Sequence, residues 1–451
     1  MLRKALKTVS LILALSILLS CTGFALTVSS KPPVTSVETG EKWILSLGTD
    51  YKNAPSIPVL SGGYLYTMSA KRILKIDRES GETAGTGNMS GRPTYAYVPV
   101  TVANGTVFCP IGDGVIEAFD AETLEKLWTC TDTLGGQAMT KIVYEDGKIY
   151  TGFWNSDEDD ANFDCIDAAT GEIIWSVSRA GGYYWSTCSV QGDYVVIGGD
   201  DGSEEFDAQN YICSVKKSDG TVVDSKEILG DMRSGIASYE GSLYLVTKAA
   251  KIYRTSLDSS GHFGSLASGT LSGYSTSTPA VYGGYVYIGM AGATRDEGYV
   301  GQYNAETLTE VSKVKAPGFP QCEMLVSTAF DSPVVYSTYN QGPGGVIAVT
   351  VTANGLSCEQ IYTPPASNRS YCISTLEADE NGDLYYKNDS GTIFALTHKQ
   401  SQPDDPVDPG NPDDPGEGEE EPQGRTIIQR ILDFFRAFAA FIKNLFSFFR
   451  K

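Results

Sequence analysis

The stretch IDAATGEIIW, residues 166–175, decides the fold of this 451-residue chain. Its aspartate can accept hydrogen bonds from its own turn, and its glycine can adopt the left-handed backbone that closes the turn. The residues after the glycine favour a β-strand. Degenerate copies begin at Ile76-Asp77, Phe119-Asp120 and Tyr303-Asn304, so this turn-and-strand unit is repeated along the chain.

A second, tighter turn recurs between strand-like runs at intervals of 42 to 50 residues. Most of its copies contain glycine, and such pairs supply the positive φ angles of two-residue hairpins. Four strands in this length are typical of a propeller blade. The turns are Gly62-Gly63, Asn104-Gly105, Asp146-Gly147, Gly192-Asp193, Glu240-Gly241, Gly283-Gly284 and Asn381-Gly382, with Ser332-Pro333 as a poorer copy.

The pattern Asp-x-x-Thr-Gly-Glu-x-x-Trp at residues 167–175 resembles the repeat of the quinoprotein (PQQ) dehydrogenase-type β-propellers. The resemblance covers roughly residues 38–399. It implies a superfamily of enzymes and non-enzymatic members, such as the propeller lipoprotein of the outer-membrane barrel assembly machinery. The motif is degenerate, because Trp128 and Trp175 stand at the family position, Trp43 is one residue early, and the remaining blades lack that tryptophan.

The repeats predict an all-β, eight-bladed β-propeller over residues 38–399. Seven whole units lie between about Pro55 and Pro365, and residues 374–397 supply three strands of an eighth. Residues 38–47 read as an isolated fourth strand that closes the ring and removes an exposed sheet edge. A seven-bladed ring is the alternative if one weak unit is not a blade.

The N-terminal residues 1–25 are typical of a signal peptide, with Arg3, Lys4 and Lys7 before an apolar run. Cleavage after Ala25 is favoured, and residues 26–37 then form an N-terminal extension. Cys21 also ends a lipobox-like sequence, so a lipoprotein is the alternative. Either route predicts a secreted, extracytoplasmic protein associated with the membrane or cell surface.

The C-terminal residues divide into two segments of opposite character. Residues 400–424 are an acidic Pro/Gly-rich linker, and residues 425–451 predict an amphipathic helix with a wide apolar face. Basic residues interrupt that face, so we expect it to lie in a membrane surface rather than to span it. Packing on the propeller or on a partner protein is the alternative. The candidate membrane-binding residues are Ile428, Phe434, Phe435, Phe438, Phe441, Phe446, Arg430, Arg436 and Lys443.

Composition excludes several classes of function. A net charge of −21 argues against a nucleic-acid partner, which needs clustered Lys and Arg. The nine cysteines form no Cys-x-x-Cys pair, and the eight that follow Cys21 of the signal region are expected to be buried free thiols. With two histidines, His262 and His398, the chain offers little for a His-centred metal site or catalytic triad.

Two acidic loops stand out, at residues 157–164 and 200–207. Each joins the second and third strands of a predicted blade, so the two lie on the same face. Neither matches the Asp-x-Asp-x-Asp-Gly calcium pattern, and a solvated loop is favoured over a metal site.

The family resemblance implies pyrroloquinoline quinone above the ring centre in the enzymes, with an adjacent Cys-Cys pair, a Trp floor and calcium held by Glu, Asn and Asp. No two cysteines of this chain are adjacent, and the calcium ligands cannot be placed. We therefore predict no catalytic residue, no cofactor and no metal. A carbohydrate-active or PQQ-type enzyme is the alternative.

The connections that enter each blade carry aromatic and arginine residues, which are common anchors of binding surfaces. They predict a ligand-binding mouth at the ring centre, for a protein segment or a cell-envelope glycan. Packing of these rings between blades is the alternative. The candidate residues are Tyr51, Tyr95, Tyr97, Tyr184, Trp185, Arg233, Tyr274, Phe319, Arg369 and Tyr371.

Overall fold

The structure is a computed structural model that describes residues 39–398. The predicted signal peptide, linker and C-terminal helix lie outside the described residues. Within the range, nine residues are also not described: Thr49, Tyr51, Lys52, Asp157, Glu158, Glu204, Glu205, Arg295 and Asp331.

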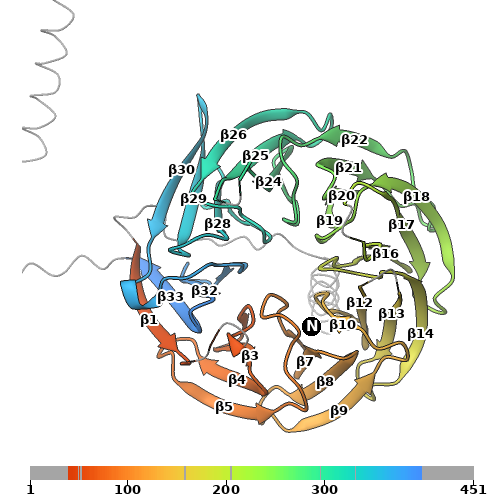
Figure 1. Ribbon diagram of the computed structural model, residues 1–451, viewed down its shortest axis with the longest axis horizontal. Coiled ribbons are helices and arrows are strands. Elements are labelled where there is room, and N and C mark those ends of the chain that lie inside the picture. The colour runs from red at the N-terminus through yellow and green to blue at the C-terminus, as the bar shows by residue number, and fades with distance from the viewer. Residues whose placement is uncertain are drawn as a thin grey trace, which may run out of the picture. The chain divides into compact units, whose positions relative to one another are not determined.

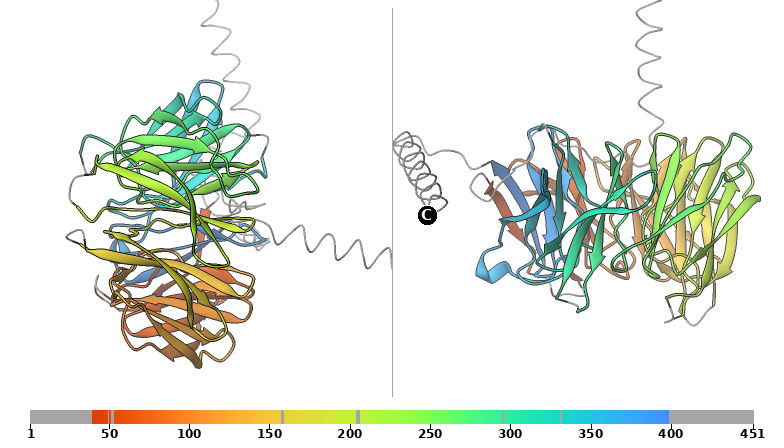
Figure 2. Two further views of the ribbon diagram at one scale, coloured as in Figure 1. Left: turned by 90° about the vertical axis from the view of Figure 1, so that its right-hand side faces the viewer. Right: turned by 90° about the horizontal axis from the view of Figure 1, so that it is seen from above.

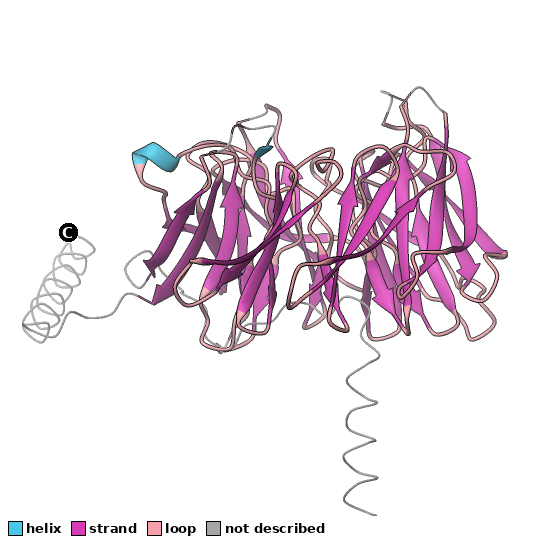
Figure 3. Ribbon diagram, turned by 90° about the horizontal axis from the view of Figure 1, so that it is seen from below, coloured by secondary structure: helices cyan, strands magenta, loops and turns pink. Residues whose placement is uncertain are grey.

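The described strands form eight antiparallel sheets arranged as a ring, which confirms the eight-bladed propeller (Figure 1). In blades 1, 2 and 4 to 7 the strands run in sequence order from the axis to the rim. In blade 3, β10 and β11 both pair with β12 on the side of the axis, and in blade 8 the order from axis to rim is β31, β32, β33 and β1. Figures 2 and 3 show the ring from the side, with the strands running between its two faces.

Blades 1 to 4 contain the following strands. Blade 1 holds β2 (Val59–Ser61), β3 (Tyr64–Ser69), β4 (Arg72–Asp77) and β5 (Thr83–Asn88); blade 2 holds β6 (Thr101–Ala103), β7 (Thr106–Ile111), β8 (Val115–Asp120) and β9 (Lys126–Thr131); blade 3 holds β10 (Gln137–Ala138), β11 (Val143–Glu145), β12 (Lys148–Trp154), β13 (Asp160–Asp167) and β14 (Ile173–Ala180); blade 4 holds β15 (Ser189–Gln191), β16 (Tyr194–Gly198), β17 (Gln209–Lys216) and β18 (Val222–Leu229).

Blades 5 to 8 follow the same order. Blade 5 holds β19 (Ala237–Tyr239), β20 (Ser242–Thr247), β21 (Lys251–Thr255) and β22 (Ala267–Thr270); blade 6 holds β23 (Ala280–Tyr282), β24 (Tyr285–Ala291), β25 (Gly298–Asn304) and β26 (Glu310–Ala316); blade 7 holds β27 (Leu325–Ser327), β28 (Val334–Thr338), β29 (Val346–Thr352) and β30 (Gly355–Tyr362); blade 8 holds β31 (Glu377–Ala378), β32 (Leu384–Asn388), β33 (Thr392–His398) and β1 (Thr39–Ser46), and a 3-10 turn, η2 (Ala366–Asn368), precedes it.

The two ends of the described chain close the ring, as the sequence predicts. Strand β1 pairs antiparallel with β33, from Thr39 opposite His398 to Ser46 opposite Thr392. A β-bulge lies between Glu41 and Trp43, and blade 3 has a bulge at the corresponding place before Trp175. Trp43 therefore occupies the same place in its blade as Trp175. Its earlier position in the sequence motif is tolerated because no turn connects β33 to β1, so the number of residues before the tryptophan is not constrained by a turn.

Two of the predicted two-residue hairpins are wrong. In blade 7, residues 328–333 separate β27 from β28, so Ser332-Pro333 is only the end of a longer loop. In blade 8, residues 379–383 separate β31 from β32, and Gly382 donates its N–H to the carbonyl of Asp379. The remaining six pairs connect consecutive strands as expected, namely β2–β3, β6–β7, β11–β12, β15–β16, β19–β20 and β23–β24.

The hydrophobic core is divided into eight clusters, and each lies between two neighbouring blades. One cluster joins Tyr66 and Ile73 of blade 1 to Phe119 of blade 2, and another joins Leu65 of blade 1 to Tyr385 of blade 8. Full burial of such side chains contributes roughly 1.5–3 kcal/mol each. A single blade has no core of its own, so stability depends on the closed ring.

Tryptophans stabilise three of the interfaces between neighbouring blades, which we call joints. The indole nitrogens of Trp43, Trp128 and Trp175 donate hydrogen bonds of 2.9–3.0 Å. Each acceptor is a backbone carbonyl in the turn between the third and fourth strands of the next blade, namely Arg78, Ala168 and Lys217.

The eight cysteines of the described chain are free thiols. Five are buried, as expected, whereas Cys213, Cys322 and Cys358 are only partly buried. No helix among the described residues has the length and apolarity needed to cross a membrane.

Candidate functional site

Connections between neighbouring blades share one face with the loops between second and third strands, because the strands of each blade alternate in direction (Figures 1 and 3). On this face, side chains of blades 2 to 7 meet in a band that we call the mouth belt. Its residues are Tyr95, Tyr97, Trp154, Tyr184, Trp185, Phe206, Arg233, Lys248, Tyr274 and Phe319.

One part of the mouth belt consists of stacked rings. Tyr95 and Tyr97 are parallel with centroids 6.3 Å apart, and Tyr97 meets Trp185 edge to face at 5.9 Å. Tyr184 then contacts both Trp185 and Trp154, with centroids 5.0 Å apart in each pair. Aromatic pairs at these separations attract each other, so the five rings hold one another in place.

The other part alternates cations with rings. The Arg233 guanidinium lies 4.1 Å from the Tyr184 ring centroid and 4.8 Å from that of Phe206. The Lys248 ammonium lies 4.3 Å from the Phe206 centroid and 4.0 Å from that of Tyr274. Desolvated cation–π contacts of this kind contribute about 2 kcal/mol.

Seven of the ten residues predicted for the mouth lie in the belt. Arg369 does not, since its Nε donates to the carbonyl of Pro364, and Tyr371 lies 53% exposed without a described ring contact. Tyr51 is outside the described residues.

Sequence reasoning missed Trp154, Phe206 and Lys248. All three lie at or within loops between second and third strands, which share the face of the predicted residues. Two of these loops stand out in the sequence for their acids, and the aromatic residues Trp154 and Phe206 lie at or within them, which is the signal that identifies these two residues. The short loop of Lys248 carries no such signal.

Trp185 occupies a strained position at the centre of the belt. Its φ is +55°, which bulky residues rarely adopt and which costs of the order of 1 kcal/mol. Its indole nitrogen is buried and has no hydrogen-bond partner in the described structure. Such strain is concentrated at functional sites, so Trp185 marks the belt as a candidate binding surface.

The two cations of the belt differ in their surroundings. Arg233 donates its Nε to the Asp200 carboxylate, so its charge is neutralised within the protein. Lys248 makes no ion pair within the described residues, and burial together with the nearby Arg233 lowers its pKa to about 8. Lys248 is therefore the better placed of the two to meet an anionic group of a ligand.

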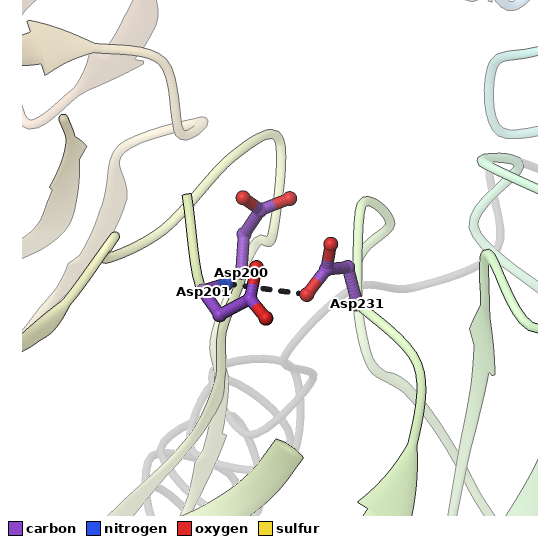
Figure 4. Close-up of side chains that lie close together, drawn as sticks. All are labelled: Asp200, Asp201 and Asp231. Carbon is purple, nitrogen blue, oxygen red and sulfur yellow. Dashed lines mark hydrogen bonds between the residues drawn. The ribbon is translucent and has the colours of Figure 1, made fainter. Parts of the chain in front are cut away.

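The solvated-loop interpretation is wrong for two aspartates. Asp164 and Asp200 are both 0% exposed. Asp200 lies with Asp201 and Asp231 in a group in which one carboxylate oxygen of each residue is within 4.8 Å of the others (Figure 4). The sequence did not indicate this group, because Asp231 comes from the next connection along the chain.

The ring centre encloses a cavity of about 270 Å³ to which all eight blades contribute. Tyr97 and Trp185 line it, so it adjoins the mouth belt. Its charged lining residues in the described chain are Lys141, Glu323 and Glu377. Burial raises the pKa of Glu323 and raises that of Glu377 to about 7, while Lys141 opposes both shifts.

The cavity residues do not fit the quinone cofactor that the fold family implies. That quinone carries three carboxylates, whereas the cavity presents two glutamates and one lysine. Like charges repel in a poorly solvated site. Cys322 lines the cavity, and its neighbours in sequence are Gln321 and Glu323, so no adjacent cysteine pair lies beside it.

The comparisons with known proteins agree with this fold. A profile of the family described as outer membrane protein assembly factor BamB matches residues 33–155. No curated protein sequence matches the chain.

Solved structures match over most of the ring. BamB from Moraxella catarrhalis is 16% identical, with a TM-score of 0.55 over 80% of this chain and 98% of that one. Quinohemoprotein alcohol dehydrogenase from Comamonas testosteroni is 13% identical, with a TM-score of 0.62 over 84% and 80%. A computationally designed protein, Ika8, is 13% identical, with a TM-score of 0.59 over 79% and 100%.

These matches support the PQQ-like β-propeller superfamily as the class of this chain. The solved structures share only the fold with it at these identities. Assembly factors, dehydrogenases and a designed protein all adopt this ring, so the function has to be argued from the site.

Proposed function

We propose that this chain is an extracytoplasmic, non-catalytic binding propeller that docks a protein segment or a cell-envelope glycan on its mouth belt. The observation that carries the proposal is the belt itself, in which rings and cations from several blades are fixed against one another beside the central cavity. A preorganised aromatic surface loses little side-chain entropy on binding.

The belt favours a protein segment over a glycan. Tyr274 is 38% exposed beside the unpaired Lys248, which suits an acidic group next to an apolar or aromatic side chain. The matched family is described as an assembly factor, which also supports binding to a protein. A glycan would stack on the same rings, so a test has to include both.

Displayed peptide libraries and glycan arrays probed with the full-length chain would test this proposal. We expect ligands whose binding falls at least tenfold in Tyr274→Ala and in Lys248→Ala, because each removes an anchor of the belt. Val311→Ala is the matched control, since Val311 is 52% exposed on rim strand β26. Ligands that bind all three variants equally, or no ligand from either source, would refute the belt as the binding surface.

The non-catalytic part of the proposal rests on the cavity charges and the sequence. Reconstitution with pyrroloquinoline quinone and calcium, followed by a dye-reduction assay with alcohols and sugars, separates it from the PQQ-type alternative. We expect no turnover, and clear turnover would favour the enzyme.

We also propose that residues 425–451 bind a membrane surface. Their apolar face is mostly Phe, Ile and Leu, and basic residues add about 1 kcal/mol each near anionic lipid. In co-sedimentation with liposomes, changing Phe434, Phe438 and Phe441 to Ser should abolish binding at any salt. Changing Arg430, Arg436 and Lys443 to Gln should weaken it mainly at low salt. A wild-type tail that stays in the supernatant with both anionic and neutral liposomes would mean that it contacts protein instead.

A further inference from the structure

Three aspartates from two separate segments converge beside the mouth belt. Asp200 and Asp201 follow β16, and Asp231 lies in the connection from β18 to β19 (Figure 4). One carboxylate oxygen of each lies within 4.8 Å of the other two. Asp200 and Asp231 are 0% and 1% exposed, whereas Asp201 is partly exposed.

Hydrogen bonds satisfy most of these oxygens. Asp200 accepts from the indole nitrogen of Trp154 at 2.9 Å, from the backbone of Gly202 at 3.0 Å, and from Arg233. The Oδ1 atom of Asp231 accepts from Asn210 at 3.1 Å and from the Asp201 backbone at 3.2 Å.

The Oδ2 atom of Asp231 is the exception. It is buried and has no hydrogen-bond partner in the described structure. Leaving a buried carboxylate oxygen unpaired costs more than a typical hydrogen bond contributes. The nearby cations do not remove this cost, because Arg233 pairs with Asp200 and the Lys248 ammonium lies over two rings. An ion held by all three carboxylates would.

The ligand chemistry indicates which ion. The group is built from carboxylate oxygens alone, which suit hard cations such as Ca²⁺ and Mg²⁺ rather than Zn²⁺. Ca²⁺ accepts irregular sets of oxygen ligands at about 2.3–2.6 Å, whereas Mg²⁺ requires near-ideal octahedral geometry at about 2.0–2.1 Å. Carboxylates from two separate segments match the less demanding geometry of Ca²⁺, and the partly exposed Asp201 leaves room for water ligands.

We propose that Asp200, Asp201 and Asp231 form a calcium site that ties the β16–β17 loop to the connection between blades 4 and 5. This loop carries Phe206, whose ring supports both Arg233 and Lys248. Calcium therefore fixes the cationic part of the mouth belt. None of the three aspartates lines the central cavity, so the site requires no ligand at the ring centre.

Terbium luminescence provides a direct test, because Tb³⁺ replaces Ca²⁺ and Trp154 contacts Asp200 closely enough to sensitise it. After treatment with a chelator, the full-length chain should bind Tb³⁺ with emission excited through tryptophan, and Ca²⁺ should displace it more effectively than Mg²⁺. Asp231→Asn and Asp201→Asn should each weaken Ca²⁺ competition at least tenfold. Asp207→Asn is the matched control, since Asp207 is an exposed acid of the same loop.

A second readout keeps the test valid if a variant is less stable. Ca²⁺ should raise the melting temperature of the wild type and of Asp207→Asn, but not that of Asp231→Asn, because an ion that binds the native state stabilises it. Three results would overturn the proposal: no sensitised emission, equal Ca²⁺ affinity in all variants, or preference for Mg²⁺. None of these measurements uses a belt ligand, so their outcome is independent of the proposed function.

Discussion

Two kinds of joint between blades use the same turn position in opposite ways. In the tryptophan joint between blades 2 and 3, Trp128 covers Gly171, and a Cβ on that glycine would lie 2.7 Å from the indole ring. In the leucine joint between blades 1 and 2, the turn carries Leu124 and the facing strand carries glycine. A Cβ on Gly87 would lie 2.6 Å from the Leu124 carbonyl oxygen.

The leucine joint recurs between blades 5 and 6, where Leu308 faces Gly269. Leu124 and Leu308 have φ angles of +57° and +58°, which cost L-residues roughly 1–2 kcal/mol each. Their side chains are 4% and 2% exposed, and burial contributes roughly 1.5–3 kcal/mol. Burial of the leucine therefore offsets the backbone strain, and a blade that lacks the motif tryptophan can use a leucine from its neighbour.

The largest effect is expected from the joint between blades 8 and 1, where Trp43 lies on a strand that no turn connects to its own blade. Deleting residues 38–47 should lower the free energy of unfolding by several kcal/mol, because it opens the ring and exposes a sheet edge. Trp43→Ala should cost less, about 3 kcal/mol, since the strand remains. Urea unfolding measures both. An unchanged melting temperature in the deletion would mean that ring closure does not stabilise the propeller.

A smaller effect should come from converting one kind of joint into the other. Trp128→Gly leaves a cavity and Gly171→Leu introduces a clash, so each alone should cost about 2–4 kcal/mol. The double variant imitates the leucine joint between blades 1 and 2, in which Gly85 occupies the position of Trp128 and a Cβ on Gly85 would lie 3.4 Å from the Leu124 side chain. It should therefore recover about 1–3 kcal/mol relative to the sum of the two single costs. A double-mutant cycle in urea measures this coupling. Additive costs would show that the two joints are not interchangeable.

The smallest effect concerns pH at the same joint between blades 2 and 3. Asp164 of blade 3 is fully buried beside Asp132 of blade 2, and burial raises the pKa of Asp164 well above its ordinary value. The native state therefore binds a proton that the unfolded chain releases near pH 4. Stability should fall as pH rises from about 5 towards the raised native pKa.

Asp164→Asn should remove this dependence. The variant keeps an oxygen for the 2.6 Å hydrogen bond from Ser176 and adds an amide donor towards Asp132. We expect it to gain on the order of 1–2 kcal/mol relative to the wild type between pH 5 and 8. Asp120→Asn is the control, because Asp120 lies in an exposed turn and its pKa is lowered by hydrogen bonds from Thr123. Parallel pH profiles for wild type and Asp164→Asn would contradict the assignment.

Local sequence signals were sufficient for much of the propeller. A turn such as Asp167–Gly171 is made by residues adjacent in the chain, because the Asp167 carboxylate accepts from the backbones of Ala169 and Thr170. The same holds for the six glycine-containing hairpins, whose positive φ angles are a property of a residue pair. The repeat also predicted the closing strand. The last unit supplies only three strands and leaves an unpaired sheet edge, which residues 38–47 were expected to cover.

The binding surface was predicted only in part, for a physical reason. Topology placed Tyr184, Arg233 and Tyr274 on one face, and the structure places them in the belt. Their partners Phe206 and Lys248 come from loops whose conformations depend on packing.

What the sequence by itself determined about this protein is the repeat and the face that carries the connections, because both follow from turns and strands made by near neighbours in the chain. The sequence favoured eight blades over seven, and the closed ring of eight sheets decided the count. Only the tertiary structure decided which buried charges meet. Asp200 and Asp231 are 31 residues apart and come together because two blades pack side by side. The exchange of tryptophan for leucine at the joints has the same cause. Side chains from two different blades together fill each joint at close packing, so the residue that fits depends on the facing blade and not on its neighbours in the chain.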